Sequence, residues 1–190
     1  EQLIESEEKY RDLFENATDL IHNIDLEGNI IYVNNAWKKT TGYLKDVKDV
    51  KNIFEIIHPD FIEESKKIFE SILKSKEGKN IYLNLINKEG KKIVVYGNVS
   101  INFKEGKPIS IRSILRDVTE EIWEKNKQNI YNNIAKIVAE KAVPEEIYEG
   151  VRKELGKAMN TETFIISYLD DEKKLTFPYY YDSVKEKGLI

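Results

Sequence analysis

Hydrophobic and polar residues alternate along three consecutive segments in the middle of the chain, residues 81–86, 93–103 and 109–116. In all three, the odd-numbered positions are the more apolar ones, as expected for strands that bury one face of an antiparallel sheet. Charged turns that contain Gly90 and Gly106 separate the segments. The pattern predicts two successive hairpins, and the last strand runs directly into a charged helix.

Two more strands are predicted near the N-terminus. Residues 20–25 and 30–34 are rich in apolar, β-branched side chains and flank a turn that contains Gly28, which is typical of a hairpin. Before them, residues 3–14 carry apolar side chains at helical spacing with charged residues between them. We therefore expect an amphipathic helix followed by a hairpin.

Residues 35–57 are broken into short pieces, with helical turns expected at 35–41 and 52–57. Pro59 then starts a longer amphipathic helix, which Gly78 is expected to end. The chain therefore carries five predicted strands, with helices inserted after the second, and belongs to the α+β class.

A charged helix is predicted from Thr119 to about Glu140. Trp123, Ile130 and Ile137 recur every seven residues along it, which is a short and imperfect coiled-coil stripe. Two interpretations stay open: the helix packs on its own domain, or it forms a parallel coiled-coil contact in a dimer.

Residues 141–190 predict one more helix, starting near Pro144, and a hairpin with strands at 163–169 and 174–181. A helix and a hairpin bury too little apolar surface for an independent core. We interpret this segment as the first part of a second domain.

Composition narrows the function classes. The net charge of −4 argues against a nucleic-acid-binding surface, and the lack of cysteine excludes disulfides, thiolate nucleophiles and Cys-ligated metal clusters. No apolar run is long enough to span a membrane, and we expect a cytoplasmic protein. The chain starts at Glu1 without a Met, and we expect it to be a piece of a longer protein.

No catalytic motif is recognised in the sequence. The adjacent carboxylates Glu63 and Glu64 are expected to be solvated surface groups, and with two histidines a His-rich metal cluster cannot form. We interpret His58 as a helix-start residue and His22 as a surface or half-buried strand residue. The prediction is that this chain is not an enzyme.

The order and spacing of several short motifs resemble a PAS domain across residues 5–120. The matching motifs are Glu8–Ala17, Tyr32-Val33-Asn34, Thr41-Gly42-Tyr43, His58-Pro59-Asp60, Lys88-Glu89-Gly90 and Arg116–Glu120. The resemblance implies a five-stranded antiparallel sheet that holds a small cavity against short helices. It also implies a sensory or dimerisation role in a signalling protein. Residues 1–118 are assigned to this domain with its N-terminal helix, and residues 119–140 to a connector helix.

The chain from about Ile134 to Ile190 resembles the N-terminal part of a GAF domain, at Ile134–Val138, Ile147–Leu155, Phe164–Asp170 and Leu175–Tyr180. Residues 141–190 are assigned to this truncated domain. The expected architecture is a PAS-like sheet with short helices on one face, a connector helix and a partial α/β GAF-like segment. This order resembles the sensor regions of histidine kinases of two-component systems and of cyclic-dinucleotide enzymes. It implies a downstream output domain in the parent chain and a homodimer through the N-terminal and connector helices.

Strand alternation and the resemblance together predict which residues face the PAS cavity. The predicted ligand-binding set is Asn34, Trp37, Phe54, Phe69, Leu83, Leu85, Val95, Gly97, Ile111 and Ser113. Two interpretations stay open: a site for a small ligand, or a closed, dry core in a structural homodimerisation module. Asn34 and Ser113 are the obvious polar members of the set, which argues against a highly charged ligand.

No cofactor is required by the sequence. A non-covalent flavin near Trp37 and a small apolar ligand stay open, whereas a cysteinyl flavin adduct is excluded by composition. The resemblance places the histidine of haem-binding PAS sensors on a helix or loop facing the cavity. The corresponding stretch from Lys45 to Asn52 has no histidine, which disfavours haem.

Asp117 and Thr119 are the predicted signal-relay residues. They match the Asp-x-Thr end of the family's domain, and both side chains can accept bonds from free amides where the strand becomes a helix. Arg116 is expected to pair with an acidic residue that the sequence does not identify. The predicted mechanism is a shift in the register or angle of the exit helix, caused by ligand binding or by a change in the dimer.

Overall fold

The computed structural model describes residues 2–43, 50–169 and 171–183. Several predictions therefore fall partly outside the described residues: the start of the 1–118 segment, much of the 45–52 stretch, Asp170, and the end of the 141–190 segment. The chain divides into two compact units, Glu1–Glu120 and Glu121–Ile190, each of which is described by itself.

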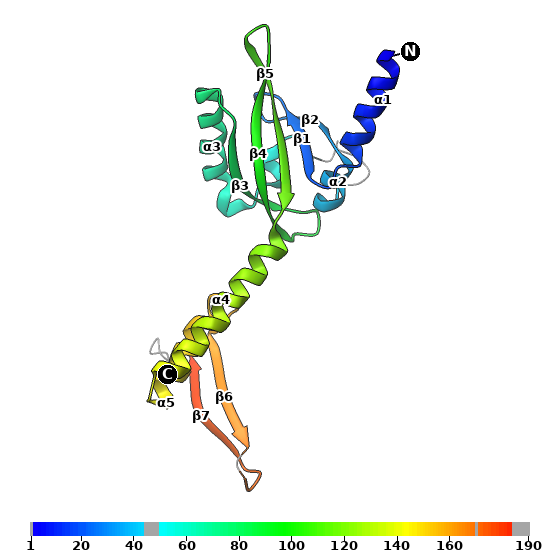
Figure 1. Cartoon of the computed structure of the whole chain (residues 1–190). Helices are drawn as coiled ribbons and strands as arrows, with labels where there is room; N and C mark the ends of the chain where they lie inside the picture. Colours follow the sequence, from blue (N-terminus) through cyan, green and yellow to red (C-terminus); the bar gives the residue numbers. More distant parts are fainter. Residues whose placement is uncertain (1, 44–49, 170, 184–190) are drawn as a thin grey trace. The chain divides into compact units, whose positions relative to one another are not determined.

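An antiparallel five-stranded sheet forms the centre of the first unit (Figure 1). Its strands are β1 (Leu20–Ile24), β2 (Ile30–Val33), β3 (Lys79–Ile86), β4 (Lys92–Lys104) and β5 (Lys107–Asp117). They lie in the order β2-β1-β5-β4-β3, so that the last strand in the sequence pairs with the first. The predicted hairpins β1–β2, β3–β4 and β4–β5 are all formed.

Helices and short 3-10 turns occupy the chain between β2 and β3. They are α2 (Asn35–Thr41), η2 (Ile53–Ile56), η3 (Pro59–Phe61) and α3 (Ile62–Ser75), and α1 (Gln2–Glu15) precedes β1. α3 ends with Lys76 in the left-handed region at φ 58°, so the prediction that Gly78 ends this helix is wrong. Gly78 instead lets the chain pass close to β4, because a Cβ there would lie 2.8 Å from the carbonyl oxygen of Val99.

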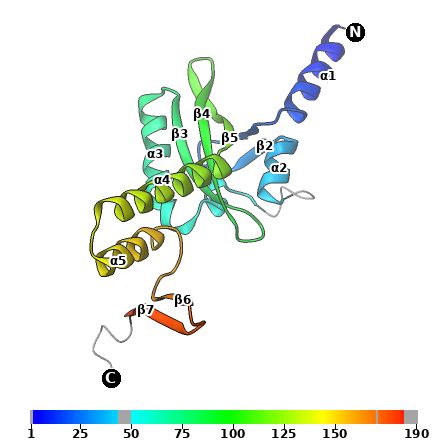
Figure 2. The ribbon, with the colours of Figure 1, turned by 60° about the horizontal axis from the view of Figure 1, so that its bottom comes forward.

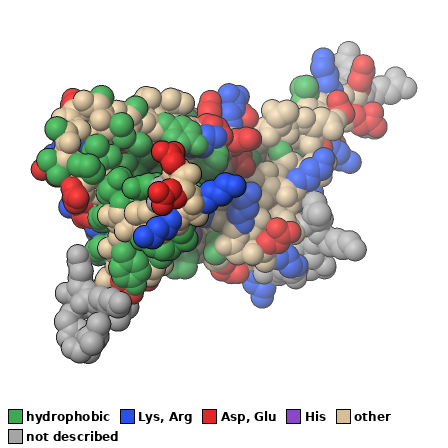
Figure 3. Space-filling model, turned by 90° about the horizontal axis from the view of Figure 1, so that it is seen from below, with side chains coloured by type: hydrophobic (Ala, Val, Ile, Leu, Met, Phe, Trp, Pro, Cys, Tyr) green, Lys and Arg blue, Asp and Glu red, His purple; other side chains and the backbone are tan. Residues whose placement is uncertain are grey.

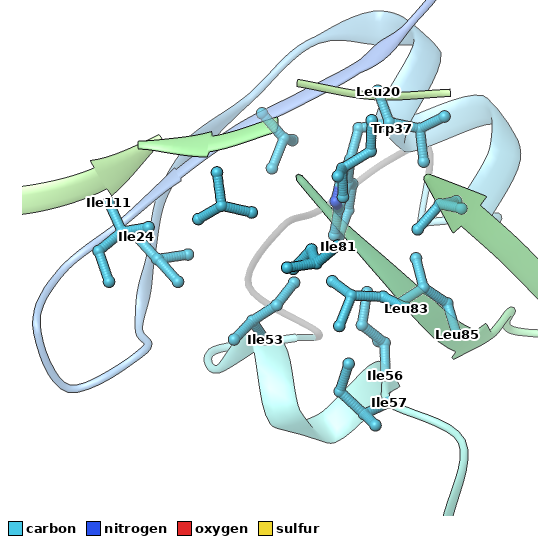
Figure 4. Close-up of a cluster of buried hydrophobic side chains, with 14 of the residues drawn as sticks. Leu20, Ile24, Trp37, Ile53, Ile56, Ile57, Ile81, Leu83, Leu85 and Ile111 are labelled. Atoms are coloured by element: carbon cyan, nitrogen blue, oxygen red, sulfur yellow. The ribbon is translucent and has the colours of Figure 1, made fainter. Parts of the chain in front are cut away.

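The apolar core lies between one face of the sheet and the short helices. Its members from β3 and β5 are odd-numbered positions, as predicted: Ile81, Leu83, Leu85, Ile111 and Leu115. In Figure 4, Ile56 and Ile57 lie near Leu83 and Leu85, while Trp37 lies beside Leu20 on the opposite side of the cluster. Removing these side chains from water is the main driving force for folding of this unit.

The second unit contains most of α4 (Thr119–Glu140), α5 (Pro144–Leu155) and a hairpin of β6 (Thr163–Leu169) and β7 (Leu175–Asp182). α5 folds back along α4 (Figure 2), with Nδ2 of Asn133 2.7 Å from Oε1 of Glu154. Ile137 of α4 packs on Gly150 of α5, where a Cβ would lie 2.8 Å from Cγ2 of Ile137. This residue of the predicted coiled-coil stripe is thus already in contact within its own unit.

Large hydrophobic side chains of the β6–β7 hairpin are exposed. They are Ile165, Tyr168, Leu169, Leu175, Phe177 and Tyr180. Figure 3 shows hydrophobic side chains gathered over much of the surface in the view from below. A two-stranded hairpin is marginally stable unless something packs on it, so this element depends on its contacts with α5.

Candidate functional site

A small cavity lies inside the first unit, between the sheet and α3. Its volume is about 40 Å³, and most of its wall is formed by isoleucine and phenylalanine side chains. These come from β1, β3 and β5 on the sheet side, and from η2, the adjoining Ile57 and α3 on the other. Figure 4 shows Ile24 beside Ile111, and Ile53 on the η2 side of the cluster.

Half of the predicted ligand-binding set lines this cavity. The lining members are Phe54, Phe69, Leu83, Ile111 and Ser113. The other members, Asn34, Trp37, Leu85, Val95 and Gly97, are not part of the lining. Strand alternation therefore selected the correct face of the sheet, but it did not locate the cavity along that face.

Asn34 is a structural junction. Its Oδ1 accepts hydrogen bonds from the backbone amides of Ile21 and Trp37, both at 3.0 Å, and so caps α2. Its Nδ2 donates to the carbonyl oxygens of Asp19 at 2.9 Å and Phe14 at 3.2 Å. The fully buried side-chain amide thereby holds the end of α1, the start of β1 and the start of α2 together. Its oxygen and nitrogen are already bonded to backbone groups and are not available to a ligand.

The other four members have packing roles. Trp37, Leu85 and Val95 are buried among core side chains. At Gly97 the next strand passes so closely that a Cβ would overlap the carbonyl oxygen of Ile114. The glycine thus gives β5 room to approach β4 and opens no space for a ligand.

The sequence interpretation missed two polar residues of the cavity lining, His22 of β1 and Ser65 of α3. The prediction of a surface or half-buried position is wrong: His22 is 2 % exposed and lines the cavity. It shares its strand face with Leu20 and Ile24, both buried, and this parity is the signal that indicates an inward side chain. Burial lowers the pKa of His22 to about 4, so that the imidazole is neutral at neutral pH.

The size of the cavity limits what it can hold. A volume of about 40 Å³ corresponds to about three water molecules. Pockets for drug-sized ligands begin at about 300 Å³. A cavity of this size therefore does not fit a flavin or a haem.

Asp117 and Thr119 form a hydrogen-bonded clasp where β5 ends and α4 begins (Figure 1). Oδ1 of Asp117 accepts from the backbone amide of Thr119 at 2.9 Å and from its hydroxyl at 2.6 Å. Oγ1 of Thr119 in turn accepts from the amide of Val94 at 2.9 Å, and the carbonyl of Val94 accepts from the amide of Val118 at 2.9 Å. The start of α4 is thus tied to β4 as well as to β5.

Arg116 pairs with Asp19, with Nε 3.2 Å from Oδ1. The arginine side chain is 70 % exposed, so the attraction is screened and contributes little to stability. The pair connects the end of β5 to the segment that enters β1. It supplies the acidic partner that the sequence did not identify.

A sequence profile of the PAS domain matches residues 19–120. Because the match covers more than half of the chain, the chain belongs to the PAS domain family. The profile includes the whole sheet, the cavity and the clasp. No curated protein matches the chain.

Solved structures share this fold. The PAS domain of an HTR-like protein from Haloarcula marismortui is 24% identical, with a TM-score of 0.53 over 61% of this chain and 94% of that one. A PAS domain from Colwellia psychrerythraea is 18% identical, with a TM-score of 0.54 over 60% and 98%. The LOV protein of Rhodobacter sphaeroides is 12% identical, with a TM-score of 0.53 over 82% and 93%. At these identities the likeness shows the fold alone.

Within the described ranges, no helix combines the length and apolarity needed to cross a membrane. The likeness of residues 141–190 to a GAF domain stays a prediction.

Proposed function

We propose that this chain is the sensory and dimerisation region of a signal-transduction protein, in which the PAS domain relays a change in its sheet to α4. The observation that carries the proposal is the clasp of Asp117 and Thr119 on Val94. A helix tied to two neighbouring strands at its first turn must follow any change in their relative position. The chemistry of the relay is mechanical, and the region itself is not an enzyme.

A homodimer through α1 and α4 is part of this proposal. Both helices expose large apolar side chains, among them Tyr10 and Leu13 on α1 and Trp123 and Tyr131 on α4. Exposed apolar side chains on helices are suited to pair with a second copy. A parallel pair of α4 helices would convert a small shift at the clasp into a change of register or angle.

We further propose that residues 141–190 are the N-terminal part of a GAF-like domain, and that an output domain, such as a histidine kinase or a cyclic-dinucleotide enzyme, lies downstream in the parent chain. The helix followed by a hairpin, with exposed apolar strands, supports the first part of this proposal. The parent's activity would then respond to the position of α4.

Asp117→Ala tests the relay. A cysteine introduced at exposed Lys125 provides one spin-labelling site per chain, because the sequence has no other cysteine. In the dimer, the distance distribution between the two labels is expected to be narrow in the parent sequence and broad in Asp117→Ala. The fluorescence of buried Trp37, measured with Trp123→Phe, is expected to stay unchanged because the core remains folded.

Glu120→Ala is the matched control, since Glu120 is likewise an exposed acidic residue at the junction of β5 and α4 but takes no part in the clasp. Its distance distribution is expected to stay narrow. An equally narrow distribution in Asp117→Ala would exclude the clasp as the relay. A monomer at all protein concentrations would overturn the dimer, and with it this form of the mechanism.

A further inference from the structure

His22 lies in the wall of the cavity with one buried ring nitrogen, Nδ1, unpaired. Among the residues that the structure describes, nothing hydrogen-bonds its buried Nδ1 atom. A neutral imidazole carries one donor and one acceptor nitrogen. A buried polar atom without a partner is destabilising because it has lost its hydration without compensation, so the site favours a molecule that supplies a partner.

Two serine hydroxyls line the same cavity from opposite sides. Ser113 of β5 is the register partner of His22 of β1, so the two side chains lie next to each other on the inward sheet face. Ser65 belongs to α3, across the cavity from the sheet. All three residues are more than nine-tenths buried. Polar groups on both walls of an otherwise apolar cavity are the arrangement of a binding site.

The cavity also limits the size and charge of its occupant. The volume of about 40 Å³ holds about three water molecules. A single organic molecule of about three to five covalently linked heavy atoms is of comparable size. Within the described part of the chain, its lining contains no Asp, Glu, Lys or Arg. A charged ligand would lose its hydration without gaining a counter-ion.

We propose that this cavity binds a neutral molecule of about three to five heavy atoms with one hydrogen-bonding end and a short apolar chain, of the class of short-chain alcohols and primary amides. The polar end bonds to His22 and Ser113, and the apolar chain lies among the isoleucine side chains. The inference rests on the proposed sensory function and gives it a ligand class. Ser113 lies four residues before Asp117 on β5, so the ligand contacts the strand that leads to the clasp.

Histidine side-chain NMR on the full chain tests the proposal. The chain has two histidines, and His58 is not part of the cavity lining. Titration with propan-1-ol and with propionamide is expected to shift the ring nitrogens of His22 saturably and to leave those of His58 in place. Sodium propionate, a charged probe of similar size, is expected to leave His22 unchanged at the same pH and ionic strength.

Ser113→Ala is expected to weaken propan-1-ol binding at least about threefold, the effect of one lost hydrogen bond. Ser110→Ala is the matched control, because Ser110 is also buried on β5 but hydrogen-bonds to Asn102, 3.0 Å away, and does not line the cavity. Linear, non-saturating shifts, or equal shifts at both histidines, would overturn the proposal and leave water as the occupant. If the ligand titrations fail but Asp117→Ala still broadens the spin-label distance distribution, the ligand proposal is wrong and the proposed relay still stands.

Discussion

The two units of this chain differ sharply in how they bury apolar side chains. All buried hydrophobic residues of the described chain lie between Leu20 and Val118, in the PAS domain. In the second unit, Glu154 is the one described residue that is buried. The first unit therefore holds its elements together through a core, whereas the second relies on contacts at its surface.

The first unit is expected to be the mechanically stiffer of the two. A packed core resists deformation and transmits a displacement from one strand to the next. A helix and hairpin with exposed apolar faces yield more easily, because local opening exposes little additional apolar surface. The clasp of Asp117 and Thr119 lies where the first unit ends, and in the proposed relay it is the position at which a small displacement would be passed to α4.

The largest expected effect is on the first unit, from Asn34→Ala. The substitution leaves two backbone amides and three backbone carbonyls without their buried partner. We expect the free energy of unfolding of the PAS domain to fall by about 4 kcal/mol. Urea unfolding followed by Trp37 fluorescence measures this free energy, in chains that also carry Trp123→Phe so that Trp37 is the one tryptophan.

Asn35→Ala is the control for this substitution, because Asn35 is the exposed neighbour in the first turn of α2. It should cost less than about 0.5 kcal/mol. A loss of similar size in both variants would show that Asn34 does not act as the junction.

The next effect is a pH dependence that originates in the core. Burial lowers the pKa of His22 to about 4, from about 6.5 in the unfolded chain. Between these values the unfolded state binds more protons, so stability is complete above pH 6.5 and is lost as the pH falls towards 4, by about 3 kcal/mol. The free energy of unfolding of the parent chain minus that of His22→Leu should fall by that amount between pH 7 and pH 4. A difference that is independent of pH would show that His22 does not titrate as a buried neutral group.

The smallest effect is expected in the second unit, from Glu149→Gln. Glu149 pairs with Arg152 at 2.6 Å and accepts a hydrogen bond from the hydroxyl of Tyr179. Arg152 and the hydrogen bonds lower the pKa of Glu149 to about 2, so the network is complete above pH 4.5 and weakens as the pH falls towards 2. Because the group is about one-third exposed, we expect a loss of about 1 kcal/mol or less.

Amide hydrogen exchange of α5 and β7 reports this change, while the Trp37 transition should not move. If Glu149→Gln instead shifted the Trp37 transition, the two units would be energetically coupled, and the stability of the first unit would not depend on its own core alone.

Alternation of apolar residues was enough to predict the sheet and its inward face. It identified Leu83, Ile111 and Ser113 as cavity residues because a strand places every second side chain on one face. It misjudged Asn34, since that side chain bonds to backbone groups up to 20 residues away, which no local pattern encodes. The same parity that buries Leu20 and Ile24 indicates a buried His22, although histidine is less often fully buried than an aliphatic residue.

Close approaches between the backbones of neighbouring strands could not be predicted from the sequence either. The role of Gly97 depends on the path of β5 over β4, which is a property of the folded sheet. The end of α3 at Lys76 depends on a non-glycine residue in the left-handed region, which propensity does not favour. Asp117 and Thr119 were predictable as partners because both bonds between them span two residues. Their link to Val94 needed the structure.

The most direct test of the clasp is hydrogen exchange of the Val94 amide in Thr119→Val, a substitution that keeps the shape of the side chain and removes the hydroxyl. The account predicts faster exchange at Val94 together with the first turn of α4, while β1 and the centre of β5 keep their protection. Faster exchange at Val94 with an unchanged α4 would contradict it, because the strand and the helix would then move independently.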